Sequence, residues 1–206
     1  MVLITIEGID GSGKSSLVSS LARLLEDECP VITREPGSTW VGDAVRRAIA
    51  DEVDPVTEAL LFVADHAAHI TTVIRPALSA GMLVISDRYS DSRYAYQQVM
   101  LEGIIDEPLA WLRAVHNGWT IPPDLTFLIV LPVGVALSRM GDGRTREHFE
   151  EAGFLARVQE NYLSLAAEEP SRFVLVDGLK NEEEIAEFVT GSIRDFSGSS
   201  RSHHRR

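Results

Sequence analysis

The stretch of sequence that decides the fold is Gly8-Ile9-Asp10-Gly11-Ser12-Gly13-Lys14-Ser15. It matches the pattern G-x-x-x-x-G-K-[ST] and follows an apolar run, residues 2–6, that is typical of a buried strand. Its glycines let successive backbone N–H groups point inward at phosphate oxygens, and a following helix adds the positive end of its dipole. The stretch therefore predicts a phosphate-binding loop between a strand and a helix.

The last two side chains of this stretch suit nucleotide chemistry. Lys14 is expected to reach β- and γ-phosphates, and Ser15 offers a hydroxyl oxygen to a Mg²⁺ ion. A helix that begins near Lys14 is supported by leucines at helical spacing, Leu17, Leu21, Leu24 and Leu25. The alternative is a chance match in a glycine-rich turn, but strand, loop and amphipathic helix follow one another in the order that the motif requires.

Composition limits the possible partners and location. With 206 residues and 45% hydrophobic composition, the chain is long enough for one α/β domain and short for two. Its net charge of -12 argues against nucleic acid or an anionic membrane as the main partner, so any phosphate site must be a local basic pocket. The single cysteine, Cys29, cannot form an intrachain disulfide, and neither a signal sequence nor a membrane-length apolar span is evident. We expect a cytoplasmic protein.

Strand and helix patterns alternate along the chain. Five apolar strands are predicted at residues 2–6, 30–33, 82–86, 125–131 and 172–177. Helices are predicted between them, the longer ones at residues 56–78, 153–168 and 182–195. This order predicts a three-layer α/β fold, of the P-loop NTPase type, with a five-stranded parallel sheet and right-handed crossovers. The domain is expected to span residues 1–196, and residues 197–206, which are rich in serine and glycine, are expected to be disordered.

Polar residues follow the second and third strands, where ligands bind in open parallel sheets. The Glu35-Pro36-Gly37 turn is placed to face a substrate, although it could be a plain turn. Asp87 ends the third strand and is expected to hold Mg²⁺ or its waters. Arg88 comes next and suits a phosphate, because a guanidinium donates two parallel hydrogen bonds. A buried Asp–Arg ion pair is the alternative.

Two further segments leave alternatives open. Phe62 and His66 share a face of the long helix, which either packs inward or lines a cleft for a planar heterocycle. The segment Gly141 to Arg146 holds two glycines and the arginines Arg144 and Arg146. It suits a flexible lid that closes over phosphates, but it could equally be a charged surface loop.

Taken together, these motifs resemble the thymidylate kinase family. The segments that carry the resemblance occur in the family's order between Val2 and about Phe196, and they are residues 6–15, 34–39, 60–65, 87–89, 92–97 and 123–126. The resemblance implies transfer of the γ-phosphoryl group of ATP to dTMP with Mg²⁺, in the pathway of dTTP synthesis, by a homodimer.

The resemblance also implies roles for individual residues. ATP would contact Gly8, Ile9, Asp10, Gly11, Ser12, Gly13, Lys14, Ser15, Ser16, Asp177 and Gly178. The dTMP site would be built from Asp10, Glu35, Pro36, Arg46, Phe62, His66, Arg88, Ser92, Tyr96 and Gln97. Catalysis would rest on Lys14, Arg88, Arg144 and Arg146, and Mg²⁺ would be held by Ser15 and Asp87.

Two departures from the family pattern concern the site. His66 stands where an arginine commonly reads thymine O4, and we expect its imidazole to donate there instead. Some members carry an arginine inside the phosphate loop, whereas this chain has Gly11-Ser12, so the resemblance implies that Arg144 or Arg146 supplies that charge from the lid. Other functions remain open: another nucleoside monophosphate or deoxynucleoside kinase, or a nucleotide-dependent switch with little catalysis.

Overall fold

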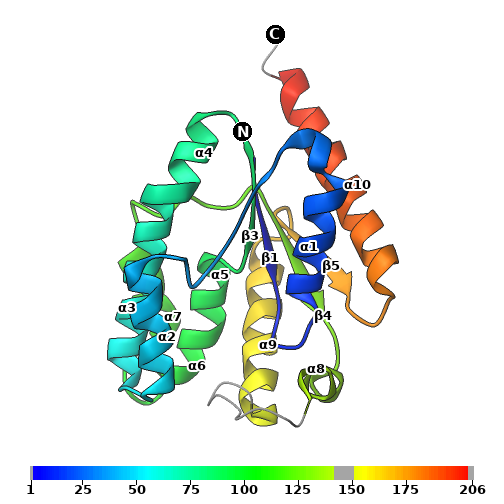
Figure 1. Cartoon of the computed structure of the whole chain (residues 1–206). Helices are drawn as coiled ribbons and strands as arrows, with labels where there is room; N and C mark the ends of the chain where they lie inside the picture. The colour runs from blue at the N-terminus through cyan, green and yellow to red at the C-terminus, as the bar shows by residue number, and fades with distance from the viewer. Residues whose placement is uncertain (1, 142–150, 204–206) are drawn as a thin grey trace.

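A five-stranded parallel sheet forms the centre of the molecule (Figure 1). The computed structural model describes residues 2–141 and 151–203. The strands lie in the order β2-β3-β1-β4-β5, and every neighbouring pair is parallel. They are β1 (Val2–Glu7), β2 (Val31–Arg34), β3 (Leu83–Asp87), β4 (Leu125–Val130) and β5 (Phe173–Asp177). The predicted fold class and strand number are thus confirmed.

Helices cover both faces of the sheet. Side chains alternate between the faces along a strand, so Ile4 and Ile6 pack against α1 (Lys14–Leu24) and α10 (Glu182–His203), which lie side by side in Figure 1. Leu3 points to the opposite face and packs against residues 70–78, the later part of the long helix that starts at Pro55. α9 (Ala152–Glu168) covers Leu128 and Phe173 on that same face.

The remaining elements connect the strands. They are η1 (Glu26–Glu28), α2 (Trp40–Ala50), α3 (Pro55–His69), η2 (Ile70–Ile74), α4 (Arg75–Ser79), α5 (Ser90–Ser92), η3 (Arg93–Gln97), α6 (Gln98–Met100), α7 (Pro108–His116) and α8 (Val133–Met140). Here α3, η2 and α4 follow one another without a break, as do α5, η3 and α6. In the described part of the chain, no helix combines the length and apolar character needed to cross a membrane.

The long helix predicted at residues 56–78 forms, with an interruption that the periodicity does not reveal. Asp54 caps its start by accepting a hydrogen bond from the Thr57 N–H, and Pro55 takes the first helical position. A π-helical turn follows α3, and at its end the Arg75 N–H bonds to the Ile70 carbonyl. Pro76 lacks an N–H, so the regular ladder cannot continue unchanged across this point.

The last helix is longer than its sequence pattern predicts. The pattern predicts an end at Asp195, but α10 continues to His203. Phe196 packs against the core, and Arg194 donates hydrogen bonds to Glu28 and to the Leu24 carbonyl. These contacts anchor the end of α10, and extending an existing helix costs far less than starting one. Residues 204–206 lie outside the described part of the chain, as do Arg144 and Arg146 of the predicted lid.

Candidate active site

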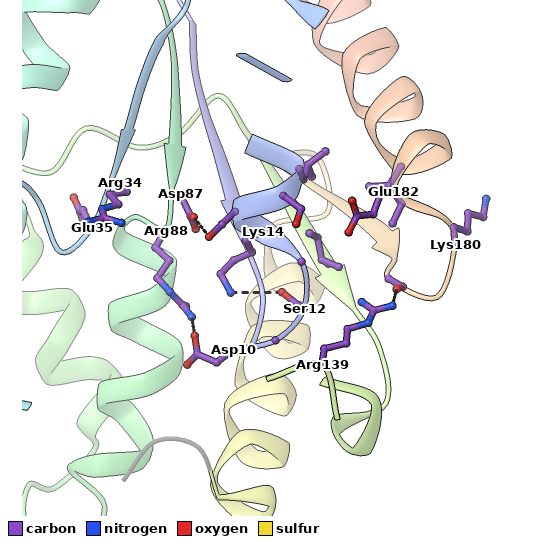
Figure 2. A pocket seen from close by; sticks show the side chains of 18 of the residues that line it. Asp10, Ser12, Lys14, Arg34, Glu35, Asp87, Arg88, Arg139, Lys180 and Glu182 are labelled. Atoms are coloured by element: carbon purple, nitrogen blue, oxygen red, sulfur yellow. Dashed lines mark hydrogen bonds and ion pairs between the residues drawn. The ribbon is translucent and has the colours of Figure 1, made fainter. Parts of the chain in front are cut away.

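The carboxyl ends of β1 and β3 meet at one edge of the sheet and open into a cavity of about 750 Å³ (Figure 2). Ile6 pairs with Asp87 in the parallel register, and the Arg88 N–H donates to the Ile6 carbonyl. The residues that line the cavity are Asp10, Gly11, Ser12, Gly13, Lys14, Ser15, Ser16, Leu17, Arg34, Glu35, Pro36, Arg46, Asp87, Arg88, Ile129, Arg139, Gly178, Lys180, Glu182 and Ile185. Two strand ends that are far apart in sequence therefore share one polar cavity.

The predicted phosphate-binding loop follows β1 and needs glycine at defined positions. Gly8 has φ 143° and Gly11 has φ 76°, conformations that L side chains rarely adopt. A Cβ at Gly11 would lie 2.2 Å from the Ala136 carbonyl oxygen, because α8 packs directly on the loop. The loop backbone can thus curl tightly only with these residues, as the motif predicts.

Lys14 lies inside this loop. Its Nζ donates to the Ile9 carbonyl at 2.8 Å and contacts Ser12 Oγ at 3.5 Å, as Figure 2 shows for Ser12. Burial lowers the pKa of Lys14 to about 8, with the Arg88 charge acting in the same direction. Among the described residues no carboxylate forms a hydrogen bond with this ammonium, which leaves its charge for an anion in the cavity.

Ser15 and Asp87 bring two oxygen ligands together at the cavity wall. Ser15 Oγ donates to Asp87 Oδ2 at 2.9 Å, and both residues line the cavity. Hydroxyl and carboxylate oxygens are the ligands that Mg²⁺ prefers. Within the described residues there is no cluster of three or more His, Cys, Asp or Glu that could hold a metal alone. The pair therefore suits an ion that takes its remaining ligands from phosphates and water.

Arg88 faces the phosphate loop through an ion pair with Asp10 (Figure 2). Its guanidinium also donates to Tyr96 Oη at 3.1 Å and to the Gly8 carbonyl at 3.3 Å. Burial alone would raise the pKa of Asp10, but the charges of Arg88 and Lys14 outweigh burial and lower it to about 2. The ion pair that was considered as an alternative for Arg88 thus exists, with Asp10 rather than Asp87 as the partner, and it directs Arg88 into the cavity.

Glu7 supports this arrangement, and the motif analysis did not single it out. Its buried carboxylate accepts hydrogen bonds from the Tyr89 N–H at 2.8 Å, Ser92 Oγ at 2.6 Å and Tyr162 Oη at 2.8 Å. Burial and the nearby Asp91 charge raise the pKa of Glu7 to about 7. An acidic residue at the end of an apolar strand, directly before Gly8, was the available signal.

Glu35 faces inward rather than towards solvent. Its Oε1 lies 2.7 Å from Nδ1 of both His66 and His69, and its Oε2 accepts from Arg93 Nη2 at 2.8 Å. Burial by itself would raise the pKa of Glu35, but His66 and Arg93 hold it well below its ordinary value. Although Glu35 lines the large cavity, its carboxylate oxygens are engaged by these three side chains.

His66 was expected to face the base, and the structure places its side chain behind the Glu35-Pro36-Gly37 turn. Its side chain is fully buried, bonded to Glu35, and packed at the edge of the Tyr89 ring with a centroid separation of 4.5 Å. It lines neither cavity described here. Phe62 and His66 do share a helix face, but the hydrogen bond to Glu35 holds the imidazole behind the Glu35-Pro36-Gly37 turn, away from the smaller cavity.

A second cavity of about 190 Å³ adjoins the first. Asp10, Pro36 and Arg88 line both cavities. The smaller cavity is otherwise lined by Ile49, Phe62, Ser92, Arg93, Tyr96 and Gln97. Four of the residues predicted for the base pocket, Phe62, Ser92, Tyr96 and Gln97, are thus brought together, and the sequence analysis missed Arg93 and Ile49.

Arg46 comes from α2 and lines the larger cavity on the side of the Glu35-Pro36-Gly37 turn. Both of its Nη atoms lie 3.1 Å from the Gly37 carbonyl oxygen, and one contacts Asp43 at 2.6 Å. Arg34 lies beside this turn and also lines the cavity (Figure 2). Three arginines, Arg34, Arg46 and Arg88, therefore line the same cavity as the phosphate loop.

The far end of the larger cavity is formed by the segment after β5. Gly178 lines the cavity, and Arg139 Nη2 donates to its carbonyl at 2.9 Å. Asp177, by contrast, is not among the lining residues, and its Oδ1 accepts from the Leu179 N–H within its own turn. Arg139 and Lys180, which the sequence analysis did not name, place positive charge here.

Comparison with known proteins gives one consistent result. A family model described as thymidylate kinase matches residues 6–189. A protein of Methanoculleus marisnigri, described as "Probable thymidylate kinase", is 64% identical over 200 residues, which cover 97% of this chain and 98% of that protein. Relatives with the same description in Methanospirillum hungatei and Natronomonas pharaonis are 58% and 48% identical, and the matches cover 94% and 93% of this chain and 94% and 97% of those proteins.

Proposed function

Because this chain belongs to the thymidylate kinase family, we propose that it transfers the γ-phosphoryl group of ATP to dTMP, giving ADP and dTDP. The observation that carries the proposal is the junction of the two cavities. A phosphate-binding loop and three arginines line the larger cavity together, and a smaller, partly aromatic cavity opens beside Arg88. A nucleoside monophosphate fits this layout, with its phosphate at the junction and its base in the smaller cavity.

The phosphate loop is the site proposed for the phosphates of ATP. Its backbone N–H groups and the start of α1 would bind the phosphate oxygens, and Lys14 would neutralise charge on the transferring group. Arg88 and Arg46 would hold the phosphate of dTMP on the opposite side. Residues that follow different strands would thus position the two anionic groups for in-line attack of one on the other.

Little acid–base chemistry is required of the protein. The acceptor phosphate is already anionic, so catalysis consists mainly of positioning and of charge neutralisation. The ion pair with Asp10 keeps Arg88 oriented before substrate arrives, which lowers the cost of ordering its side chain on binding. Asp10 itself would lie near the sugar 3′-hydroxyl, and Tyr96, which bonds Asp10 and Arg88, would crowd the 2′ position.

Ser15 and Asp87 are the residues proposed to hold Mg²⁺. The ion fits this pair because Ser15 Oγ and Asp87 Oδ2 are oxygen ligands, and these two atoms lie 2.9 Å apart. When bound, Mg²⁺ would neutralise charge on the β- and γ-phosphate oxygens. Ser15 and Asp87 would hold the ion at the end of the phosphate loop.

The remaining assignments follow from the lining of the two cavities. Phe62 offers an aromatic face to the base, and Ser92 lines the same cavity. Gly178 and Arg139 would border the adenine of ATP. Arg144 and Arg146 are proposed, from the family resemblance alone, to close over the phosphates. The same resemblance supports a homodimer and a cytoplasmic location.

The test is coupled ADP release with dTMP, dUMP, UMP, CMP and thymidine as acceptors. A dTMP-dependent rate that exceeds the others supports the proposal. Thymidine as the preferred acceptor would show a deoxynucleoside kinase instead. Slow ATP hydrolysis that no acceptor accelerates would show a nucleotide-dependent switch.

A further inference from the structure

A carboxylate and a phenol lie buried behind Arg88, outside the two cavities. Glu7 ends β1 and Tyr162 belongs to α9, and both residues are fully buried. Neither is among the residues that line the larger or the smaller cavity. Tyr162 Oη donates a hydrogen bond to Glu7 Oε2 at 2.8 Å. A buried carboxylate is costly unless hydrogen bonds compensate it, so the other partners of Glu7 indicate its role.

One oxygen of Glu7 holds the backbone at Arg88. Arg88 has φ 67°, a left-handed conformation that residues other than glycine rarely adopt. Glu7 Oε1 accepts from the next backbone N–H, that of Tyr89, at 2.8 Å. On the other side of the turn, Ser86 Oγ donates to the Arg88 carbonyl at 2.7 Å. Glu7 therefore helps to stabilise the strained turn from which the Arg88 side chain extends.

The other oxygen of Glu7 acts on the guanidinium through two hydroxyl groups. Glu7 Oε2 accepts from Ser92 Oγ at 2.6 Å and from Tyr162 Oη at 2.8 Å. Arg88 Nη1 donates in turn to the same two oxygens, at 3.2 Å and 3.5 Å. When both hydroxyl hydrogens are donated to Glu7, the oxygen lone pairs are left to accept from Arg88. The guanidinium is thus held at Nη1 by this group and at Nη2 by Asp10.

We propose that Glu7 and Tyr162 are positioning residues for Arg88, and that they hold its guanidinium in the orientation that binds the phosphate of the acceptor nucleotide. The proposal rests on the proposed function, because it takes Arg88 to be the ligand of that phosphate. An arginine that is fixed in advance loses less conformational freedom when the anion binds. Affinity for dTMP should therefore depend on Glu7 and Tyr162, whereas affinity for thymidine, which lacks the phosphate, should not.

Tyr162→Phe is the first test, because it removes the hydroxyl and keeps the ring. The protein is titrated with dTMP and with thymidine in the absence of ATP, at pH 8, where Glu7 with its pKa of about 7 carries its charge. The Kd for dTMP should rise by about 5- to 30-fold, and that for thymidine should change by less than about twofold. Tyr94→Phe is the matched control, because Tyr94 lines neither of these cavities; it should leave both Kd values unchanged.

Glu7→Gln is the second test, because glutamine keeps the shape of the side chain. Its amide oxygen can still accept from the Tyr89 N–H, but its NH₂ group then donates towards the two hydroxyls and reverses those hydrogen bonds. The same selective loss of dTMP affinity is expected, with the melting temperature measured in parallel. If Glu7→Gln does not fold, Tyr162→Phe decides the matter.

A double substitution shows whether Tyr162 acts through Arg88. In Arg88→Met, which binds dTMP weakly, the addition of Tyr162→Phe should cause no further loss. Equal weakening of dTMP and thymidine in Tyr162→Phe, no weakening of either, or a full additional loss in the double variant would overturn the inference and leave the proposed function intact. If the unaltered protein binds dTMP no more tightly than thymidine, the inference and the phosphate-binding role of Arg88 both fail. Tight binding of dTMP without dTMP-dependent ADP release would overturn the proposed function alone.

Discussion

Ser15 Oγ donates a 2.9 Å hydrogen bond to Oδ2 of Asp87 and so joins the first turn of α1 to the end of β3. The two residues are 72 positions apart in the sequence, and parallel pairing of β1 with β3 brings them together. This relationship places two oxygen ligands beside the phosphate loop. The first prediction follows from it.

Removing either oxygen ligand should weaken the response to Mg²⁺. Ser15→Ala and Asp87→Asn are expected to raise the Mg²⁺ concentration needed for half-maximal turnover by about 10- to 100-fold. Ser19→Ala is the control, because Ser19 is exposed, donates to the Ser15 carbonyl and is not among the residues that line the cavity. Initial rates over a Mg²⁺ titration at fixed ATP measure the effect. An unchanged half-saturation point in both variants would remove the pair from the metal site.

Lys14→Ala should lower kcat by about 10²- to 10³-fold, because charge that develops on the transferring group would go uncompensated. The fold should survive, since a buried ammonium contributes little once its desolvation is counted. Lys180→Ala is a matched control, because Lys180 is the other lysine of the chain and lines the same cavity at its far end. Coupled ADP release and thermal unfolding are the measurements. Comparable kcat in the two variants would contradict the catalytic role of Lys14.

Affinity for ATP should fall as the pH rises through about 8. Lys14 has a pKa of about 8 in the empty loop because burial disfavours its charged form, and bound phosphates favour that form. Binding above pH 8 therefore requires proton uptake, and the dissociation constant for ATP should rise by up to about tenfold per pH unit. Titrations between pH 7 and 9.5 measure this slope. Lys14→Met should lose it, and an identical slope in that variant would contradict the assignment.

Stability should depend on His116 in mildly acidic solution. Burial lowers the pKa of His116 from 6.5 to about 4, so the unfolded chain takes up a proton in this interval that the folded protein cannot. The contribution of this ring to the free energy of unfolding is constant above pH 6.5. It falls as the pH drops, by about 2 kcal/mol between pH 7.5 and pH 5.

Glu7 acts in the opposite direction, because its raised pKa of about 7 favours the folded state as the pH falls through 7. The His116 effect is therefore measured as a difference between the unaltered protein and His116→Gln. Urea unfolding of both at pH 7.5 and pH 5 should show a smaller loss of stability in the variant. Equal losses in the two proteins would contradict the prediction.

The two arginines of the predicted lid should not be equivalent. One of Arg144→Ala and Arg146→Ala is expected to lower kcat strongly and the other weakly, because one guanidinium can bridge the transferring group while its neighbour contacts other oxygens. Steady-state kinetics with dTMP and ATP decide which is which. If both substitutions are without effect, the missing charge must come from another residue. Arg139 is then the first to replace, because it lines the cavity.

Local signals were enough for the phosphate loop and for the sheet. The conformation of the loop at Gly8–Ser15 requires glycines that few other residues could replace. Apolar runs of strand length that are separated by helices predict a parallel sheet, and such a sheet forms. Asp87 and Arg88 could be placed at the site because strand ends in such a sheet share an edge.

The base pocket depended on tertiary structure. Helical spacing puts Phe62 and His66 on one face. It does not determine whether that face points into the cavity or into the core, or which buried carboxylate contacts it. Buried Glu35 contacts both His66 and Arg93, and in this arrangement Arg93 lines the smaller cavity while His66 lies behind it. The end of α10 was decided in the same way, through contacts of Arg194 and Phe196 with distant parts of the chain. The physical reason is common to these cases: a buried charge or an apolar ring gains most from the partner that the fold brings near, and that partner cannot be identified from neighbouring sequence.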